Sequence, residues 1–199
     1  MIRTVVWDVD DVLNDLMRSW FESVWMPDHP AEPMRYSDVS QNPPYGLLGV
    51  SRDEYLSSLD DFRLSPGYTR LEPNPDILVW LAAEGGRCRN VALTATPLRA
   101  APATAAWVLN HFGRWIREFA FIPTERMEES LPIYDTDKGA WLARHGPSSI
   151  LVDDSPQNIA AARAAGIATL SWPRPWNDGL TAPETLRALS RYVVTGIAP

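Results

Sequence analysis

The sequence predicts an α/β fold, in which a mostly parallel, Rossmann-like sheet carries helices on both faces. Three observations lead to this expectation. Apolar runs of strand type alternate with helical patterns, several of these runs end in polar motifs, and one segment after the first run interrupts the alternation. Because ligands in such sheets bind beyond the carboxyl ends of the strands, polar residues there are the first candidates for a functional site.

The elements are expected in a regular order along the chain. Ile2–Trp7 predicts a strand, and Val12–Trp25 predicts a helix whose apolar residues share one stripe. Met26–Pro44 is rich in proline and polar residues, which predicts a loop. The elements that follow are a helix over Arg52–Leu59 capped by Ser51, a turn at Ser65–Gly67, helix Asp76–Glu84, strand Asn90–Leu93, helix Leu98–Phe112, strand Phe119–Ile122, helix Gly139–His145, strand Ile150–Val152, helix Gln157–Ala165 and strand Ala168–Leu170. The tail Trp172–Trp176 is expected to wrap the outside.

The first strand ends in two carboxylates, Asp8 and Asp10, separated by one residue. Residues two apart in a strand face the same side, so the two acids are expected to lie together. Like charges at this range repel, and a divalent cation or protonation of one partner removes the cost. The motif therefore predicts a nucleophile and metal ligand beside a proton carrier, with a solvated acidic turn as the alternative.

A second polar motif is Thr94, at the end of another apolar run. Its hydroxyl and the amides that follow can donate hydrogen bonds to a phosphate. An ordinary helix cap by Thr94 or Thr96 is the alternative.

The third motif is Lys138, which is expected in the first turn of a helix capped by Thr136 or Asp137. The helix dipole disfavours a cation at this position, so a nearby anion would explain the lysine. Local pairing with Asp135 or Asp137 is the alternative.

The fourth motif is the pair Asp153-Asp154, which again follows an apolar run. Ser155 is expected to cap the next helix, with Pro156 at its first position and Gly166 past its end. A second carboxylate cluster at a strand end favours a shared functional site over a structural coincidence.

In this order, the four motifs resemble those of the haloacid dehalogenase-like hydrolase superfamily. The resemblance extends from Val5 to about Leu170, and Asp-Asp-Ser-Pro-x-Asn before an alanine-rich helix is its most specific part. It implies an α/β core domain, residues 1–13 and 73–199, with a small, mainly helical cap domain, residues 14–72, inserted after the first strand. Asp11 departs from the superfamily pattern, in which a small or neutral residue is commoner.

The resemblance also implies a mechanism through an aspartyl-phosphate, with Mg²⁺ as cofactor. Asp8 would attack phosphorus, Asp10 would carry protons, and Thr94 and Lys138 would hold the phosphoryl oxygens. The Mg²⁺ ligands would be Asp8, Asp154 and the backbone carbonyl of Asp10, supported by Asp153 and by Asn158, which would orient Asp154 or a water. Asp10 argues against dehalogenation, which needs no acid two residues after the nucleophile.

Composition and charge narrow the possible partners. The chain has 199 residues, of which 45% are hydrophobic, and a formal charge of −7. A net negative chain has no electrostatic footprint for polymeric nucleic acid, and no basic cluster favours a membrane surface. Cys88 is the only cysteine and is interpreted as a bystander thiol. Because the first strand starts at Ile2 and no long apolar run occurs, the protein is expected to be cytoplasmic.

Three functions are weighed for the chain. The leading hypothesis is a Mg²⁺-dependent phosphatase of a small phosphorylated metabolite, with a likeness to 5′-(deoxy)ribonucleotidases in residues 8–15. The alternatives are a phosphatase of a sugar phosphate or biosynthetic intermediate, and a catalytically silent binding protein. Aromatic residues crowd the cap region, and most are expected to form its core: Trp20, Phe21, Trp25, Tyr36, Tyr45 and Tyr55. Of these, Tyr36 or Tyr45 is the candidate to stack on a nucleobase.

Overall fold

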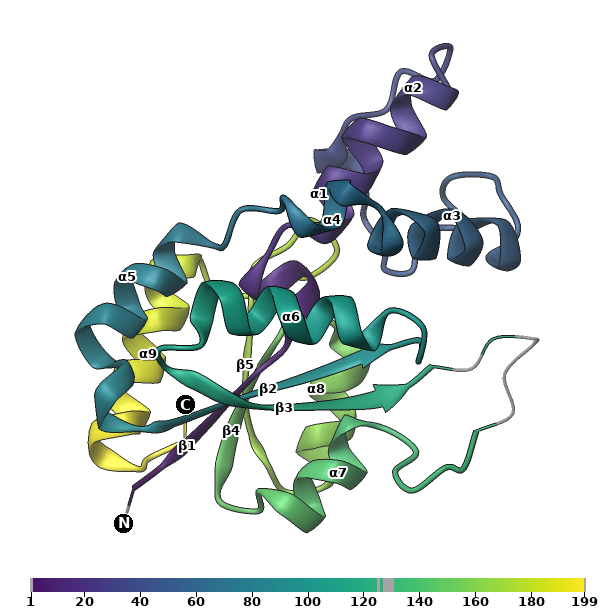
Figure 1. Ribbon diagram of the computed structural model, residues 1–199. Helices are drawn as coiled ribbons and strands as arrows, with labels where there is room; N and C mark the ends of the chain where they lie inside the picture. Colours follow the sequence, from purple (N-terminus) through teal and green to yellow (C-terminus); the bar gives the residue numbers. More distant parts are fainter. Residues whose placement is uncertain (1, 125, 127–130, 199) are drawn as a thin grey trace.

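The fold is built on a five-stranded sheet in which every pairing is parallel. The computed structural model describes residues 2–124, 126 and 131–198. The strands run in the order β3-β2-β1-β4-β5 (Figure 1). Their bounds are β1 (Thr4–Trp7), β2 (Arg89–Thr96), β3 (Ile116–Pro123), β4 (Ser149–Asp153) and β5 (Ala168–Ser171). The predicted fold class is confirmed.

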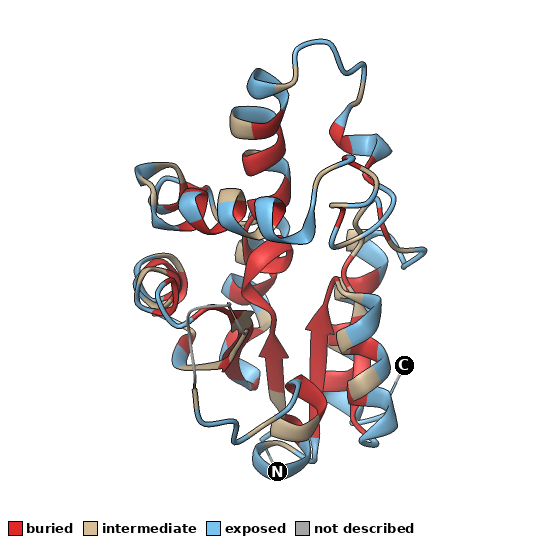
Figure 2. Cartoon of the chain, turned by 90° about the vertical axis from the view of Figure 1, so that its right-hand side faces the viewer, coloured by how far each residue is buried: buried red, intermediate tan, exposed pale blue. Residues whose placement is uncertain are grey.

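Helices cover both faces of this sheet, and alternate strand residues divide between the two cores. Val5 and Trp7 of β1 belong to the larger apolar cluster, whereas Val6 between them belongs to the smaller one. The larger cluster receives α5 (Pro75–Glu84), α6 (Ala101–Phe112) and α9 (Ala182–Thr195), and the smaller one receives α7 (Lys138–His145) and α8 (Pro156–Ala164). The buried residues follow the strands and the inner sides of the helices (Figure 2).

The segment between β1 and α5 forms a group of helices beyond one end of the sheet (Figure 1). Its elements are α1 (Leu16–Trp20), η2 (Phe21–Trp25), α2 (Met26–Asp28), η3 (Tyr36–Asp38), α3 (Arg52–Leu64) and α4 (Pro66–Thr69). The residues that join α1, η2 and α2 all have helical backbone angles, so these three elements form one continuous rod. A separate cap domain over residues 14–72 stays a prediction.

The expected helix over Val12–Trp25 was wrong at its start and at its end. Val9–Leu13 forms a turn, η1, which the Asn14 amide closes by donating to the Val9 carbonyl at 3.2 Å, and the helix begins only at Leu16. The side-chain oxygen of Asn14 accepts hydrogen bonds from the amides of Asp11 and Leu16, at 3.2 and 3.1 Å, and so separates the two elements. At the other end the helix continues to Asp28. The Met26 amide donates to the Phe21 carbonyl, five residues back, so a wider turn comes directly before Pro27.

Several other elements are longer or shorter than expected. The helix capped by Ser51 runs to Leu64 rather than Leu59, because residues of its last turns are buried and extend the packed face. The strand that contains Thr94 continues to Thr96, and the next helix starts at Ala101 rather than Leu98. The expected turn at Ser65–Gly67 opens a short helix, α4, capped by Ser65.

The tail after β5 does not wrap the outside, which corrects the expectation. Trp172 and Trp176 are buried, with exposed fractions of 2% and 7%. The tail leads into α9, which the sequence analysis missed although Thr181 and Glu184 form a capping box at its start. An indole ring buries a large apolar area, and this gain explains why the two tryptophans turn inward.

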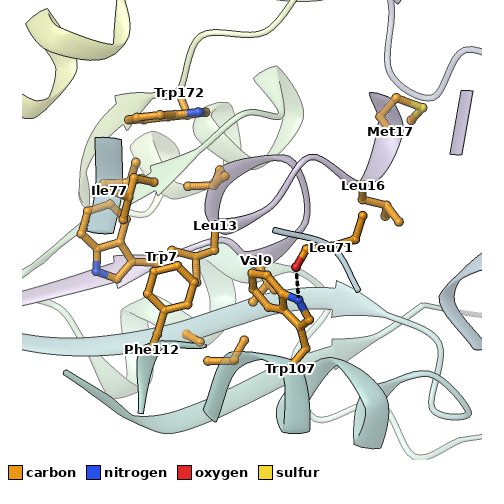
Figure 3. Packing of buried hydrophobic residues seen from close by; sticks show 14 of the residues in the cluster. Trp7, Val9, Leu13, Leu16, Met17, Leu71, Ile77, Trp107, Phe112 and Trp172 are labelled. Carbon is orange, nitrogen blue, oxygen red and sulfur yellow. Dashed lines mark hydrogen bonds between the residues drawn. The ribbon is translucent and has the colours of Figure 1, made fainter. Parts of the chain in front are cut away.

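The two stretches of chain that connect the helical segment to the core meet at one place. The Asn74 amide donates to the Leu13 carbonyl at 2.8 Å, and its side chain donates to the Val12 carbonyl at 3.2 Å. Beside this junction the Trp107 indole donates to the Leu71 carbonyl at 2.9 Å (Figure 3). The two connecting stretches therefore run side by side. In the part of the chain that the structure describes, no helix is long and apolar enough to span a membrane.

Candidate active site

The carboxyl ends of three adjacent strands bring the sequence motifs together. Trp7 pairs with Val152 of β4, and the Asp8 amide donates to the Val152 carbonyl at 2.9 Å. Asp8 therefore stands beside Asp153 and Asp154. On the other side of β1, Trp7 pairs with Ala92, which places buried Thr94 two residues further along β2.

Lys138 lies between two of the acids. Its Nζ is 2.7 Å from Asp8 Oδ1 and 2.7 Å from Asp153 Oδ2. Asp137 caps the helix by accepting from the Ala140 amide at 2.8 Å, as one of the expected caps. Burial lowers the pKa of Lys138, but the Asp153 and Asp8 carboxylates outweigh it and hold the pKa above its ordinary value. The lysine is thus a buried cation bound to distant acids, and the alternative of local surface pairing was wrong.

Three carboxylates meet around this single ammonium group. Oxygens of Asp8, Asp153 and Asp154 all lie within 4.8 Å of one another, and all three residues are buried. Burial raises the pKa values of Asp8 and Asp154 well above their ordinary range, and the Asp153 charge raises them further. One lysine cannot balance three buried carboxylates, so the cluster favours an additional cation.

The hydrogen bonds indicate which oxygens remain for such a cation. Both oxygens of Asp153 accept from protein donors: Lys138, Asn158 and the Ser155 amide. Asp8 Oδ1 accepts from the Val9 amide and Lys138. Among the hydrogen bonds of the described residues, none reaches Asp8 Oδ2 or Asp154 Oδ1. These two oxygens are the ones available to a metal ion.

The groups that support the acids differ in part from expectation. Asn158 makes no hydrogen bond to Asp154; its amide donates to both oxygens of Asp153, at 3.1 and 3.2 Å. Asp154 is held instead by the Trp176 indole, which donates to Oδ2 at 2.9 Å. The apolar character of the Trp172–Trp176 tail was the available signal for this contact, since such a segment is costly to leave in solvent.

The hydrogen-bond partners of Asp10 differ from those of the three clustered carboxylates. Arg63 approaches Oδ2 through Nε at 3.2 Å and Nη2 at 3.1 Å. Oδ1 accepts from the Tyr68 hydroxyl at 2.9 Å and from the Asn14 amide at 3.2 Å. All three donors belong to the segment of residues 14–72. The sequence analysis missed Arg63 and Tyr68, because neither position carries a local motif and their contacts depend on tertiary packing.

Asp11 shapes the turn between the strand and α1. Its backbone is left-handed, with φ of 64°, a region in which aspartate is among the tolerated residues. Its Oδ1 accepts from the Met17 amide at 2.9 Å, and its carbonyl accepts from Arg174 at 2.5 Å. Burial raises the pKa of Asp11 to about 7, although Arg174 lowers it.

Comparison with known proteins places this site in a known fold. No family model and no curated protein matches the sequence. Among solved structures, a haloacid dehalogenase-like hydrolase from Streptococcus pneumoniae is 16% identical with a TM-score of 0.62, and the match covers 94% of this chain and 90% of that one. A subfamily IA hydrolase of the same superfamily from Geobacter sulfurreducens is 17% identical with a TM-score of 0.52, covering 87% and 88% of the two chains.

A third match shows how far the likeness extends. Protein tyrosine kinase A from Mycobacterium tuberculosis is 17% identical with a TM-score of 0.62, and the match covers 91% of this chain and 87% of that one. The resemblance inferred from the motifs is confirmed at the level of the fold: the chain has the haloacid dehalogenase-like fold. Because proteins with different described activities share this fold, the reaction must be argued from the site itself.

Proposed function

We propose that the protein is a Mg²⁺-dependent hydrolase of small phosphomonoesters that works through an aspartyl-phosphate. The observation that carries the proposal is the buried cluster of Asp8, Asp153 and Asp154 around Lys138. A phosphoryl group and a divalent cation would together match its charges. The predicted roles of the site residues are part of this proposal.

The residues fit a hard cation. All the candidate ligand atoms are oxygens, which Mg²⁺ prefers, and oxygens of Asp8, Asp153 and Asp154 lie within 4.8 Å of one another. Asp8 Oδ2, Asp154 Oδ1 and the Asp10 carbonyl would hold the ion, and Asp153 would support it. When bound, the ion supplies charge neutralisation for the transferring phosphoryl group.

The chain's own groups account for the chemical steps. Asp8 forms a bond from its carboxylate oxygen to phosphorus while the ester P–O bond breaks, and Asp10 gives a proton to the leaving oxygen. Water then attacks phosphorus, Asp10 takes its proton, and the bond to Asp8 breaks to release phosphate. Lys138 balances charge on Asp8 and the phosphoryl oxygens throughout, and Thr94 donates a hydrogen bond to one of those oxygens.

The helical segment over the site would act as the cap and favour small substrates. Its aromatic rings mostly pack on one another: Trp20 meets Tyr55 edge-on, and Phe21 stacks on Trp25. Tyr36 is buried against Trp176, and only Tyr45 is half-exposed. The packing leaves little aromatic surface for a nucleobase, so no observation favours the nucleotidase hypothesis over the broader phosphatase hypothesis.

A phosphate-release assay over a panel of phosphorylated metabolites tests the proposal. Turnover is expected with Mg²⁺ and should disappear in excess chelator, and Asp154→Asn should raise the Mg²⁺ concentration that turnover needs.

Variants of the catalytic residues test the mechanism. Asp8→Asn should remain folded and inactive, Asp10→Asn should lose activity by about 10²–10⁴-fold, and Lys138→Ala should be severely impaired in activity. Asp178→Asn changes an exposed loop acid and is the matched control. Full activity in chelator, or in Asp8→Asn, would refute the mechanism.

The same panel separates the substrate hypotheses. Thymidine, uridine and adenosine monophosphates are compared with glucose 6-phosphate and glycerol phosphate by kcat/KM. A preference for the nucleotides would support the nucleotidase alternative. Equal or better turnover of the sugar phosphates would leave the broader phosphatase proposal standing alone.

A further inference from the structure

A second charge cluster lies next to Asp10, on the side of the helical segment. Its centre is Asp60 of α3, which is fully buried. Arg63 Nη1 and Arg126 Nη2 lie 3.1 and 3.0 Å from Asp60 Oδ1, and Arg99 Nη2 and Arg126 Nε lie 3.1 and 2.7 Å from Oδ2. Three guanidinium groups therefore converge on one carboxylate.

Arg63 links this cluster to the active site. Its Nη1 contacts Asp60, while its opposite edge, formed by Nε and Nη2, contacts Asp10. The Arg63 side chain is only 9% exposed, so the guanidinium is almost fully removed from water. A buried guanidinium needs an anionic partner at each edge, because an unpaired buried charge is costly.

The proposed reaction requires Asp10 to give up part of this arrangement. Both oxygens of Asp10 accept hydrogen bonds, and Arg63 is the partner of Oδ2. To exchange a proton with a leaving oxygen or a water, one Asp10 oxygen must face that atom. If Oδ2 turns to the reacting atom, the Nε–Nη2 edge of Arg63 loses its acceptor. A planar anion fits this edge through two parallel hydrogen bonds.

We propose that Arg63 and Arg99, oriented by Asp60, bind a second anionic group of the substrate, a carboxylate or a further phosphate, beside the phosphoryl group that is cleaved. This inference rests on the proposed function and specifies its substrate class. Asp60 contacts both arginines and so fixes their orientation. Arg99 follows the strand that contains Thr94, and its side chain is 44% exposed, so one guanidinium of the cluster is open to an incoming group.

The test compares two probes that differ only in the second anionic group. In 3-phosphoglycerate a carboxylate replaces the terminal hydroxymethyl group of glycerol 3-phosphate. A bisphosphate of the same carbon chain, glycerol 1,3-bisphosphate, distinguishes a phosphate from a carboxylate as the second group. Because hydrogen bonds between charged groups are strong, at least one probe with a second anionic group should exceed glycerol 3-phosphate by about 10- to 100-fold in kcat/KM.

Two variants and a matched control localise the effect. Arg99→Gln should lower this preference about tenfold, because it should reduce kcat/KM for the probes with a second anionic group more than for glycerol 3-phosphate. Arg63→Lys keeps the positive charge but loses the planar guanidinium that donates two parallel hydrogen bonds. It should lower kcat/KM for the preferred probe more than for glycerol 3-phosphate. Arg89→Gln is the control. Arg89 is also an exposed arginine paired with an acid, Glu118, but it lies at the start of β2, whereas Arg99 follows the end of β2. Thermal unfolding checks that each variant is folded.

Each outcome decides the proposal. No preference in the wild type, or equal losses for all probes in Arg99→Gln, would overturn it; equal losses would place the arginine on the cleaved phosphoryl group or in the fold. If no probe is hydrolysed, the proposed function fails separately. The same probes are then compared by calorimetric binding: tighter binding of a probe with a second anionic group by the wild type than by Arg99→Gln supports the subsite, and equal binding overturns it.

Discussion

Replacement of Asp11 by asparagine should change how stability depends on pH. Asp11 is buried, and its Oδ1 accepts from the Met17 amide. Asparagine keeps an acceptor oxygen of the same size and tolerates the left-handed backbone at this position. The variant therefore removes a titrating group while the turn before α1 is preserved.

The size and sign of the effect follow from the pKa of Asp11. Burial raises this pKa from 3.8 to about 7, so between these pH values the folded protein keeps a proton that the unfolded chain releases. A group of this kind stabilises the fold below its unfolded pKa, and that contribution is lost as the pH rises through the folded pKa. The interval corresponds to at most about 4 kcal/mol. Relative to wild type, Asp11→Asn should gain stability from pH 4 to pH 7 and then level off.

Denaturant unfolding of both proteins at several pH values between 4 and 8.5 measures this difference. Chelator is present throughout, so that metal binding to the neighbouring carboxylates does not contribute. The raised pKa of Asp8 affects both proteins and cancels in the difference, whereas the pKa of Asp154 is raised in part by the Asp11 charge and should fall in the variant. A difference that stays flat between pH 4 and 7, or that moves against the variant, would refute the reasoning.

Three further changes have expected outcomes. Trp176→Phe removes the indole donor to Asp154 and should weaken Mg²⁺ binding about 10- to 100-fold, measured by calorimetry; unchanged affinity would mean that the contact does not position the ligand. Gly139→Ala would place a Cβ 2.6 Å from the Ala161 carbonyl oxygen and should cost about 1–3 kcal/mol in thermal unfolding, whereas Gly86→Ala, which has open space, should be neutral. Ser51→Ala removes the cap of α3 and should cost about 0.5–2 kcal/mol in denaturant unfolding; no loss would show that the cap is dispensable.

Local sequence signals were enough to predict the sheet and the positions of the acids. Asp8 and Asp153 come at the ends of continuous apolar runs, which are typical of strands buried on both faces, and parallel pairing then brings them to one edge. Caps such as Ser155 and Asp137 were predicted for the same reason, since a cap involves residues only two or three positions apart. The element bounds were less accurate, because packing extended the strand of Thr94 and the helix of Ser51 beyond their local patterns.

Contacts between distant segments could not be predicted in this way. Arg63 and Asp10 are separated by 53 positions, and Trp176 and Asp154 by 22. Each of these contacts depends on how the helical segment or the tail folds back onto the site. The sequence also could not predict which acid Asn158 contacts. Asp153 and Asp154 are adjacent, so both are at a similar distance from Asn158 along the chain.

The hydrogen-bonded junction at Asn74 has a consequence for how this architecture can change. Since the segment leaves and re-enters the sheet at a single point, the entropy of closing it depends only weakly on its length, and a doubling costs about 0.6 kcal/mol. Insertions, deletions or wholesale exchange between residues 14 and 73 would thus place little strain on the strands. The acids at the strand ends would keep their geometry through such exchanges, whereas the environment of Asp10 would be rebuilt each time, because its three donors all come from the exchangeable part.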